Sequence, residues 1–306
     1  MKILVTGGAG FIASHIADAL IKQGHEVHII DSMIGGFERN IPRQAVFHKV
    51  DIRDEQVHQL WEQEGFEVMY HHAAQMDVRK SVVDPKYDAD VNVLGFLNLM
   101  EAGRSNGLKK VMLASTGGAI YGEPEYTPQD ESHPVRPLSP YGITKLVSER
   151  YLFFYEHTHN IDWISLRYAN VYGPRQNAHG DAGVVAIFSE RMLRDQSAHI
   201  NGNGGQTRDY VYVKDVVQAN LKALNHADNG IFNVGTAVET DVNRLFDVLQ
   251  DLTGTSIEKQ HAEAKPGEQQ RSVVGIKKIE NEMGWKPEYN LEEGLKETVE
   301  WFKNQK

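Results

Sequence analysis

A tyrosine and a lysine four residues apart are the clearest candidates for chemistry in this sequence. Tyr141 and Lys145 lie in the run Ser-Pro-Tyr-Gly-Ile-Thr-Lys at 139–145, which predicts the start of a helix. On a helix, side chains at i and i+4 share one face. A free phenol has a pKa of about 10 and is a poor base at neutral pH, but a nearby ammonium favours the phenolate. The pair suits an acid–base couple, although on its own it is more often a surface tyrosine beside a solvated lysine.

A glycine-rich turn near the N-terminus is the second candidate. Residues 6–13 read Thr-Gly-Gly-Ala-Gly-Phe-Ile-Ala, after a predicted strand at Lys2–Thr6 and before a predicted helix at Phe11–Gln23. This is the dinucleotide-binding fingerprint in the form that ends in alanine. The glycines permit a tight turn, and the helix N-terminus offers N–H groups to a pyrophosphate. The residues expected to contact it are Gly7, Gly10, Phe11 and Ile12.

An acidic residue at the end of the second predicted strand indicates which dinucleotide would bind. Asp31 closes the strand Glu26–Asp31, at roughly the 20-residue spacing that the fingerprint requires. Its carboxylate can accept hydrogen bonds from both ribose hydroxyls and would repel a 2′-phosphate. Residues 32–34 bring no arginine to offset that repulsion. The sequence therefore favours NAD over NADP.

The next two predicted strands end in further candidate residues. Asp51 and Ile52 close the third strand, where they could lie beside the adenine, although Asp51 could instead cap the following helix. The fourth strand ends in His-His-Ala-Ala-Gln at 71–75. Adjacent residues on a strand point to opposite faces, so these histidines do not predict a metal site. The small residues could let the backbone approach a cofactor at Ala73, Ala74 and Gln75.

Strand-like and helix-like segments alternate over the first 170 residues, which predicts a parallel sheet covered by helices on both faces. The predicted fold is α/β, a doubly wound, Rossmann-type sheet with a smaller C-terminal substrate lobe. The expected domains are 1–170, to which the chain returns around 209–235, and a mainly substrate-binding lobe at 171–306. Further predicted strands are Ala45–Val50, Glu67–His72, Lys110–Ser115 and Trp163–Arg167, and further predicted helices are Asp54–Glu64, Asp84–Asn106, Ser139–Asn160, Asp241–Thr253 and Leu291–Lys303.

Composition excludes several classes of protein. The 306 residues are 41% hydrophobic and 24% charged, which is typical of a folded globular chain. The net charge of −10 disfavours nucleic acid and anionic membranes as partners. Without cysteine there is no disulfide or thiolate metal site. No apolar run approaches the ~18 residues of a membrane span and no secretory signal is recognisable, so a cytoplasmic protein is expected.

Four motifs occur together and in order. They are the glycine-rich turn at 6–13, the Asp51-Ile52 pair, the Tyr-x-x-x-Lys at 141–145 and Arg-Tyr-Ala-Asn-Val-Tyr-Gly-Pro at 167–174. With them the chain resembles the extended short-chain dehydrogenase/reductases over nearly its whole length. Within that superfamily it looks most like the nucleotide-sugar epimerases of the UDP-glucose 4-epimerase type.

The resemblance implies a mechanism in which NAD is held throughout the cycle. Tyr141, as a phenolate, would take the proton of the sugar 4′-hydroxyl while C4′ loses hydride to the nicotinamide, and hydride would return to the other face of the 4-keto sugar. Lys145 would lower the tyrosine pKa and bind the nicotinamide ribose. A serine or threonine completes the family's set, but the usual position falls on Gly117. A bulge at the double glycine is expected to bring Thr116, or else Ser115, into that role.

The resemblance also implies a substrate and its ligands. Interconversion of UDP-glucose and UDP-galactose is expected, with the diphosphate on Asn170 and Arg208 and the uridine ribose on Glu268. Arg271 would hold phosphate, or it would form an ordinary surface ion pair. Ser272 falls at the family's wall beside the sugar 2′-substituent, and its small size suggests that N-acetylated UDP-hexosamines are also accepted. These substrate-binding residues are Ser115, Thr116, Asn170, Arg208, Glu268 and Arg271.

Other functions are open to different degrees. A 4,6-dehydratase would carry an Asp-Glu pair where this chain has Gly118-Ala119. Arg79 and the run Arg175-Gln176-Asn177 keep UDP-glucuronate epimerisation as an alternative. A non-catalytic NAD-binding regulator would tend to lose the catalytic tyrosine or lysine, and both are present. Family members usually pair through two helices per subunit, so a homodimer through Asp84–Asn106 and Ser139–Asn160 is expected.

Overall fold

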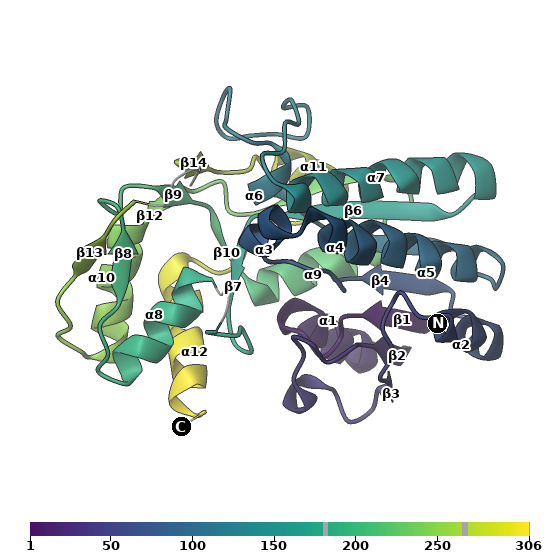
Figure 1. Ribbon diagram of the computed structural model, residues 1–306, viewed down its shortest axis with the longest axis horizontal. Coiled ribbons are helices and arrows are strands. Elements are labelled where there is room, and N and C mark those ends of the chain that lie inside the picture. The colour runs from purple at the N-terminus through teal and green to yellow at the C-terminus, as the bar shows by residue number, and fades with distance from the viewer. Residues whose placement is uncertain (180–182, 265–268, 306) are drawn as a thin grey trace. The chain divides into compact units, whose positions relative to one another are not determined.

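The computed structural model describes residues 1–179, 183–264 and 269–305, and the chain forms two compact units (Figure 1). Unit 1 comprises residues 1–120, 137–167 and 217–232. Unit 2 comprises residues 121–136, 168–216 and 233–306. The chain therefore passes between the units several times, whereas the sequence prediction drew its main boundary at residue 170.

A seven-stranded sheet in the order β11-β6-β5-β4-β1-β2-β3 forms the centre of unit 1. The pairings among the first five strands are all parallel. The predicted doubly wound, Rossmann-type α/β fold is confirmed, because strand order reverses on either side of β1. The strands are β1 (Lys2–Thr6), β2 (Glu26–Ile30), β3 (Val46–His48), β4 (Val68–His71), β5 (Lys110–Thr116), β6 (Asp162–Tyr168) and β11 (Gly230–Val234).

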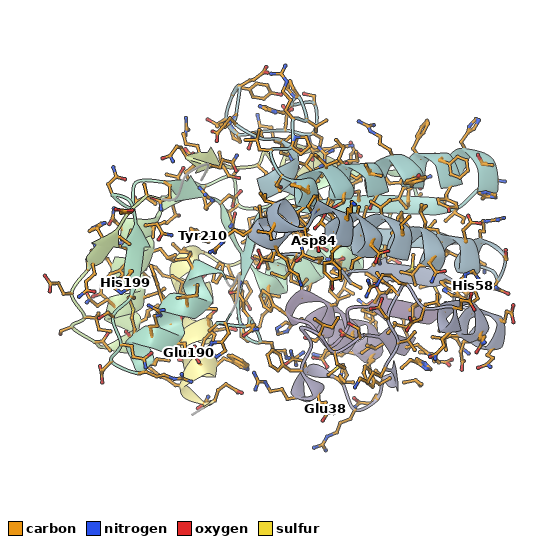
Figure 2. All side chains as sticks on the ribbon, viewed as in Figure 1. Glu38, His58, Asp84, Glu190, His199 and Tyr210 are labelled. Atoms are coloured by element: carbon orange, nitrogen blue, oxygen red, sulfur yellow. The ribbon has the colours of Figure 1, made fainter. Side chains whose placement is uncertain are left out.

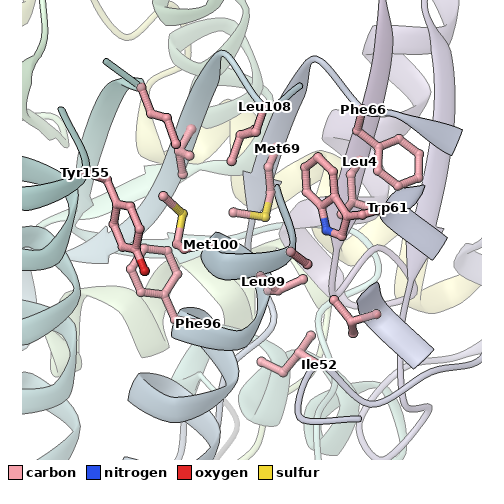
Figure 3. Close-up of a cluster of buried hydrophobic side chains, with 14 of the residues drawn as sticks. Leu4, Ile52, Trp61, Phe66, Met69, Phe96, Leu99, Met100, Leu108 and Tyr155 are labelled. Atoms are coloured by element: carbon pink, nitrogen blue, oxygen red, sulfur yellow. The ribbon is translucent and has the colours of Figure 1, made fainter. Parts of the chain in front are cut away.

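Alternating side chains of the strands supply two helix-covered faces. Met69 of β4 belongs to a buried cluster with Trp61, Phe96 and Leu152 (Figure 3). Its neighbour Tyr70 points the other way and donates a hydrogen bond to the carbonyl of Asn220, at 3.3 Å. The face of the sheet on which Met69 lies is covered by α2 (Gln56–Glu64), α5 (Gly95–Arg104) and α7 (Pro140–His159). The opposite face packs against α1 (Phe11–Lys22) and α9 (Val213–Leu224).

The helix predicted at Asp84–Asn106 is interrupted. Asp84 caps α4 (Pro85–Ala89) by accepting the N–H of Tyr87, at 3.0 Å (Figure 2). A π-helical turn, η2 (Asp90–Leu94), follows before α5 begins at Gly95. Such turns insert one extra residue into the helical ladder and are frequent at functional sites. Buried Asn92 lies in this turn, and its bonds to other segments provide a physical reason for the interruption.

Helix α7, which carries Tyr141 and Lys145, agrees closely with the prediction at both ends. The hydroxyl of Ser139 accepts the N–H of Gly142 at 3.1 Å, and proline at the first helical position needs no such acceptor. Asn160 ends the helix in the left-handed conformation, at φ 54°. A short helix that the sequence did not reveal, α3 (Val78–Val83), is capped by Asp77. Ser81 of α3 accepts the N–H of Tyr141 at 3.2 Å and so anchors the start of α7.

Unit 2 is built from short strands and helices. A central strand pair joins β7 (Asn170–Tyr172) to β10 (Tyr210–Tyr212), parallel and largely buried. None of the helices within the described residues is long and apolar enough to cross a membrane. The other elements are α6 (Gly117–Ile120), α8 (Val184–Leu193), β8 (His199–Asn201), β9 (Thr207–Arg208), β12 (Thr240–Asp241), α10 (Val242–Thr253), β13 (Gln260–Ala262), β14 (Arg271–Ser272), α11 (Lys277–Met283) and α12 (Leu291–Lys303), of which α6 lies in unit 1.

Candidate active site

The glycine-rich turn between β1 and α1 fits a pyrophosphate. Gly7 has φ 71°, and a Cβ there would lie 2.8 Å from the nitrogen and 2.9 Å from the Cα of Ala73, so the position requires glycine. The N–H of Gly10 bonds back to the carbonyl of Gly7 at 2.9 Å and tightens the turn. No side chain among the described residues caps α1. Its first N–H groups, including those of Phe11 and Ile12, are thus suited to hold an anion.

Asp31 is tied to this turn by both carboxylate oxygens. Oδ2 accepts the N–H of Ala9 at 3.0 Å, and Oδ1 accepts the N–H of Met33 at 2.8 Å. Burial raises the pKa of Asp31, and the two N–H bonds oppose that rise. Each oxygen of a carboxylate can accept more than one hydrogen bond, so both can also receive a ribose hydroxyl. The arrangement fits NAD at the predicted position.

Asp51 does not cap the helix after it, so that alternative interpretation is wrong. Its carboxylate is held by Arg53, with Oδ1 accepting Nε at 3.0 Å and Oδ2 accepting Nη2 at 2.8 Å. This ion pair competes more strongly for the carboxylate than a backbone N–H of α2 can, and it lowers the pKa of Asp51. The side chain of Ile52 is buried, and its Cδ1 packs against Gly95. This side chain is therefore engaged within the protein, which leaves the backbone of Ile52 for any contact with an adenine.

Thr6 organises the end of β4. Its hydroxyl oxygen accepts the N–H groups of His72 and Ala73, at 3.2 and 3.1 Å. These two N–H groups occupy both lone pairs of the hydroxyl oxygen, so its hydrogen is directed to Nδ1 of His71, 2.9 Å away. Burial lowers the pKa of His71 well below its usual value and that of His72 to about 3, so both rings are neutral. This geometry places the backbone of Ala73 directly beside Gly7.

One cluster with metal-ligand spacing exists within the described residues, at the start of β2 and the end of α2. Glu26, His28 and Glu64 each offer a ligand atom, and these atoms lie within 4.8 Å of one another. The ammonium of Lys2 already pairs with the two carboxylates, 2.9 Å from Glu64 and 3.3 Å from Glu26. The single ammonium thus engages both carboxylates, and the cluster is an ion-pair network.

Tyr141 and Lys145 share one face of α7, as their spacing predicts. Lys145 is buried, its Nζ lies 6.0 Å from the centre of the Tyr141 ring, and it donates to the carbonyl of Ala114 at 3.0 Å. Burial lowers the pKa of Lys145 to about 8, opposed by the charges of Asp88 and Glu149. Burial, followed by the charge of Asp88, raises the pKa of Tyr141. Further positive charge is needed to favour the phenolate.

Thr116 and Ser115 have separate roles at the end of β5. The hydroxyl of Ser115 is buried and donates to Oε1 of Glu149 at 2.7 Å. The hydroxyl oxygen of Thr116 accepts the N–H of Ala119 at 3.2 Å and caps the helical turn α6. Among the described residues, no acceptor engages the hydroxyl hydrogen of Thr116. The double glycine forms this turn and not the expected bulge, and the geometry favours Thr116 as the family's catalytic hydroxyl.

A buried ion pair behind α7 was not predicted. Glu149 accepts Nη2 of Arg167 at 2.7 Å and Nε at 3.0 Å, and both side chains are 2% exposed or less. Ser165 donates to Glu149 as well, at 2.9 Å, in addition to Ser115. The sequence does show that Glu149 lies two helical turns after Tyr141 and that Arg167 opens the motif at 167–174. Their pairing connects α7, β5 and β6.

A second buried network joins the segment after β4 to α7. Gln75 donates its N–H to Oδ1 of Asn92 at 2.8 Å, and Nδ2 of Asn92 returns a bond to the Gln75 carbonyl at 3.0 Å. The side chains of Gln75, Asn92 and Thr144 all donate to Asp88. The amide of Gln75 is thus engaged within the protein, so any contact with a cofactor would involve its backbone.

The candidate substrate residues of unit 2 occupy short strands. Asn170 begins β7 with an exposed side chain, and its N–H bonds to the carbonyl of Asp209 at 2.9 Å. Arg208 ends β9, with Nη1 donating to the Thr207 carbonyl at 2.8 Å. Arg271 starts β14 on the neighbouring strand. Glu268 lies outside the described residues.

The register of β9 and β14 separates the two arginines. Arg271 pairs with Thr207 and Ser272 pairs with Arg208, so Arg208 and Arg271 point to opposite faces of this small sheet. Arg271 makes two bonds to Glu239, at 2.9 and 2.7 Å, and one to the hydroxyl of Thr127 at 3.0 Å. The surface ion-pair interpretation of Arg271 therefore describes this structure.

The fold and the residues of unit 1 define a class of protein. A parallel sheet with an uncapped, glycine-rich helix start and a ribose-suited acid is a dinucleotide-binding domain, and the tyrosine–lysine pair adds acid–base chemistry. The model of the NAD dependent epimerase/dehydratase family matches residues 3–235. The chain belongs to this family.

Whole-chain comparisons give relatives within the family. A UDP-glucose 4-epimerase of Mycolicibacterium smegmatis is 42% identical over 310 residues, covering 99% of both chains. The solved UDP-glucose 4-epimerase of Thermotoga maritima with UDP-glucose is 46% identical, with TM-score 0.98 over 100% of this chain and 99% of that one. The Thermus thermophilus UDP-glucose 4-epimerase in complex with NAD is 43% identical, with TM-score 0.95 over 99% of each chain.

Proposed function

We propose that the protein is an NAD-dependent 4-epimerase that interconverts UDP-glucose and UDP-galactose. The observation that carries the proposal is the arrangement at α7 and β5. Lys145 lies against Ala114 and the Tyr141 ring, and the hydroxyl hydrogen of Thr116 is available at the end of the same strand. The relatives with this activity align over nearly the whole of both chains.

The roles of the residues follow from this geometry. NAD, when bound, would supply a reversible hydride acceptor for C4′ of the sugar. Tyr141 takes the proton of the 4′-hydroxyl and later gives it back, and Thr116 donates to the same oxygen. Lys145 has two further N–H donors besides the one on Ala114, which suit a ribose hydroxyl, and its charge stabilises the phenolate. The family resemblance, and not this geometry, assigns the UDP part of the substrate to Asn170, Arg208 and Glu268.

The test is purified protein with UDP-galactose and no added NAD, with UDP-glucose followed by chromatography. We expect interconversion, and its loss in Tyr141→Phe. Tyr151→Phe, a matched change on the same helix, should retain activity. No conversion by the unchanged protein, with NAD added as well, would contradict the proposal.

Acceptance of N-acetylated UDP-hexosamines is a finer part of the proposal. Ser272 is small and shares its face of the β9–β14 pair with Arg208. A large side chain there should exclude a 2′-N-acetyl group and spare UDP-glucose. We expect Ser272→Tyr to lose activity on UDP-N-acetylglucosamine and to keep its activity on UDP-glucose. If the variant matched the unchanged protein on each of these two substrates, this role for Ser272 would be excluded.

We also propose a homodimer through α7 and the neighbouring π-helical turn. Phe153 is 64% exposed, Leu94 57%, Ile143 49% and Phe154 45%, and η2 packs against α7. Exposed large apolar residues gathered on adjacent helices are typical of an interface. Phe153→Glu should convert a dimer into a monomer in sedimentation, whereas Val238→Glu, an equally exposed residue of unit 2, should not. A monomeric unchanged protein would contradict the proposal.

A further inference from the structure

Asp88 is a buried carboxylate outside the sequence motifs at 6–13, 51–52, 141–145 and 167–174. It lies on α4, is 0% exposed, and within the described chain no lysine, arginine or histidine is within ion-pair distance of it. Its Oδ1 accepts Nε2 of Gln75 at 2.9 Å and Nδ2 of Asn92 at 3.2 Å. Its Oδ2 accepts the hydroxyl of Thr144 at 2.8 Å. All its direct partners are thus neutral.

A buried carboxylate needs compensation beyond neutral hydrogen bonds. Taking such a charge out of water is costly unless an opposite charge lies near it. Lys145 makes no direct contact with Asp88, but the two charges interact through space. The interaction is mutual, so the negative charge of Asp88 stabilises the protonated form of Lys145.

The other charged groups around Lys145 do not replace Asp88. Glu149, on the same helix, is neutralised by its ion pair with Arg167. His71 and His72 of the neighbouring strand end are neutral, because their pKa values are lowered. Asp88 is therefore the carboxylate near Lys145 whose charge no direct cation cancels, among the residues that the structure describes.

The donors to Asp88 also come from three separate segments. Gln75 follows β4, Asn92 lies in the π-helical turn, and Thr144 immediately precedes Lys145 on α7. The carboxylate therefore fixes the turn of α7 that carries the tyrosine–lysine pair against the end of β4. Thr144 also lies 3.0 Å from the carbonyl of Tyr141.

We propose that Asp88 is a positioning residue of the epimerase, the buried counter-charge that keeps Lys145 an ammonium and holds its turn of α7 in place. This inference deepens the proposed function and rests on it for its catalytic meaning. Its electrostatic part concerns the protein without substrate and can be measured separately.

The experiment uses Asp88→Asn, because this change removes the charge and can keep the hydrogen bonds. The new side-chain oxygen can still accept from Gln75 and Asn92. The new amide can donate to the Thr144 hydroxyl, which can then turn to the Tyr141 carbonyl. The charge of Asp88 raises the pKa of both Lys145 and Tyr141. Its loss should move both limbs of the pH–rate profile to lower pH, by about one unit.

A second readout needs neither substrate nor cofactor. In the folded protein burial lowers the pKa of Lys145 from its usual value of 10.5 to about 8. Between these values the unfolded chain binds more protons, so Lys145 makes the free energy of unfolding rise with pH. In Asp88→Asn that rise should begin about one pH unit lower. In the Lys145→Met background, Asp88→Asn should no longer move it.

Thr144→Val is the matched control, since it removes a hydrogen bond to Asp88 and keeps the charge. It should lower activity without moving either limb. The proposal would be overturned if the pH–rate profile of Asp88→Asn, scaled to the same maximum rate, coincided with that of the unchanged protein. It would also be overturned if Asp88→Asn still shifted the pH dependence of unfolding in the Lys145→Met background. If the unchanged protein has no epimerase activity, the proposed function fails, while the unfolding series still decides the charge coupling between Asp88 and Lys145.

Discussion

The nucleotide end and the catalytic end of unit 1 are built in different ways. At the nucleotide end, Gly7, Gly10 and Asp31 act through backbone conformation and bonds to backbone N–H groups. At the catalytic end, Tyr141 and Lys145 are surrounded by buried side chains from distant segments. A phosphate and a ribose need donors and space, whereas a general base needs a controlled electrostatic environment.

The largest expected effect concerns the proton-transferring group itself. Tyr141→Phe should lower kcat by roughly 10³-fold, within the usual contribution of a positioned acid–base group. The melting temperature should be nearly unchanged, because the ring stays. Steady-state kinetics with UDP-galactose measures the loss. A kcat within a factor of a few of the unchanged protein would assign the proton transfer to another residue.

The buried ion pair behind α7 should dominate the stability of the catalytic end. Glu149→Gln leaves the buried guanidinium of Arg167 without its counter-charge, which costs about 3–5 kcal/mol of unfolding free energy. The exposed pair Glu125–Arg136 provides the control, and Glu125→Gln should change stability little. Denaturant unfolding measures both. Equal effects would show that burial does not distinguish these pairs.

The glycine turn should be sensitive to a single methyl group. Gly7→Ala meets both an unfavourable φ and the backbone of Ala73, and should cost at least about 2 kcal/mol. Gly24 also has positive φ, at 84°, but nothing lies within 4 Å of a Cβ there. Gly24→Ala therefore carries the backbone cost alone. The free energy of unfolding and the amount of NAD retained would be measured for both variants. Equal losses of unfolding free energy in Gly7→Ala and Gly24→Ala would show that the close approach to Ala73 does not contribute to the cost.

The two arginines of unit 2 should differ in their smaller effects on substrate binding. Arg208→Ala should raise KM for UDP-galactose about tenfold, which corresponds to about 1.4 kcal/mol. Arg271→Ala should raise it less, because Glu239 and Thr127 hold that guanidinium on the other face. Initial rates over a range of substrate concentrations measure both. A larger effect at Arg271 would restore the phosphate-binding prediction for that residue.

The same contrast explains how much the sequence reveals. The strands of the central sheet other than β11, together with α1 and α7, follow from apolar runs, caps and glycines that are local in sequence. The π-helical turn does not, because it depends on bonds from Asn92 to Gln75 and Thr144, 17 and 52 residues away. The residue types at 84–106 do not distinguish a helix with this π-helical turn from one continuous α-helix.

The candidate site divides along the same line. The spacing of Tyr141 and Lys145 is visible in the sequence, and the choice between Thr116 and Ser115 is not. That choice depends on Glu149, which engages Ser115 from 34 residues away. In unit 2 the strands that carry Arg208 and Arg271 are two residues long, so no periodicity could predict their faces.

The most direct test of the central claim follows the hydrogen at C4. The protein is incubated with UDP-galactose that carries tritium at C4 of the sugar, without added NAD, and the UDP-glucose formed is isolated. Removal and return of the same hydrogen within one site predict that the tritium stays at C4 and that none reaches water. Release of tritium to solvent during conversion would contradict the proposed mechanism.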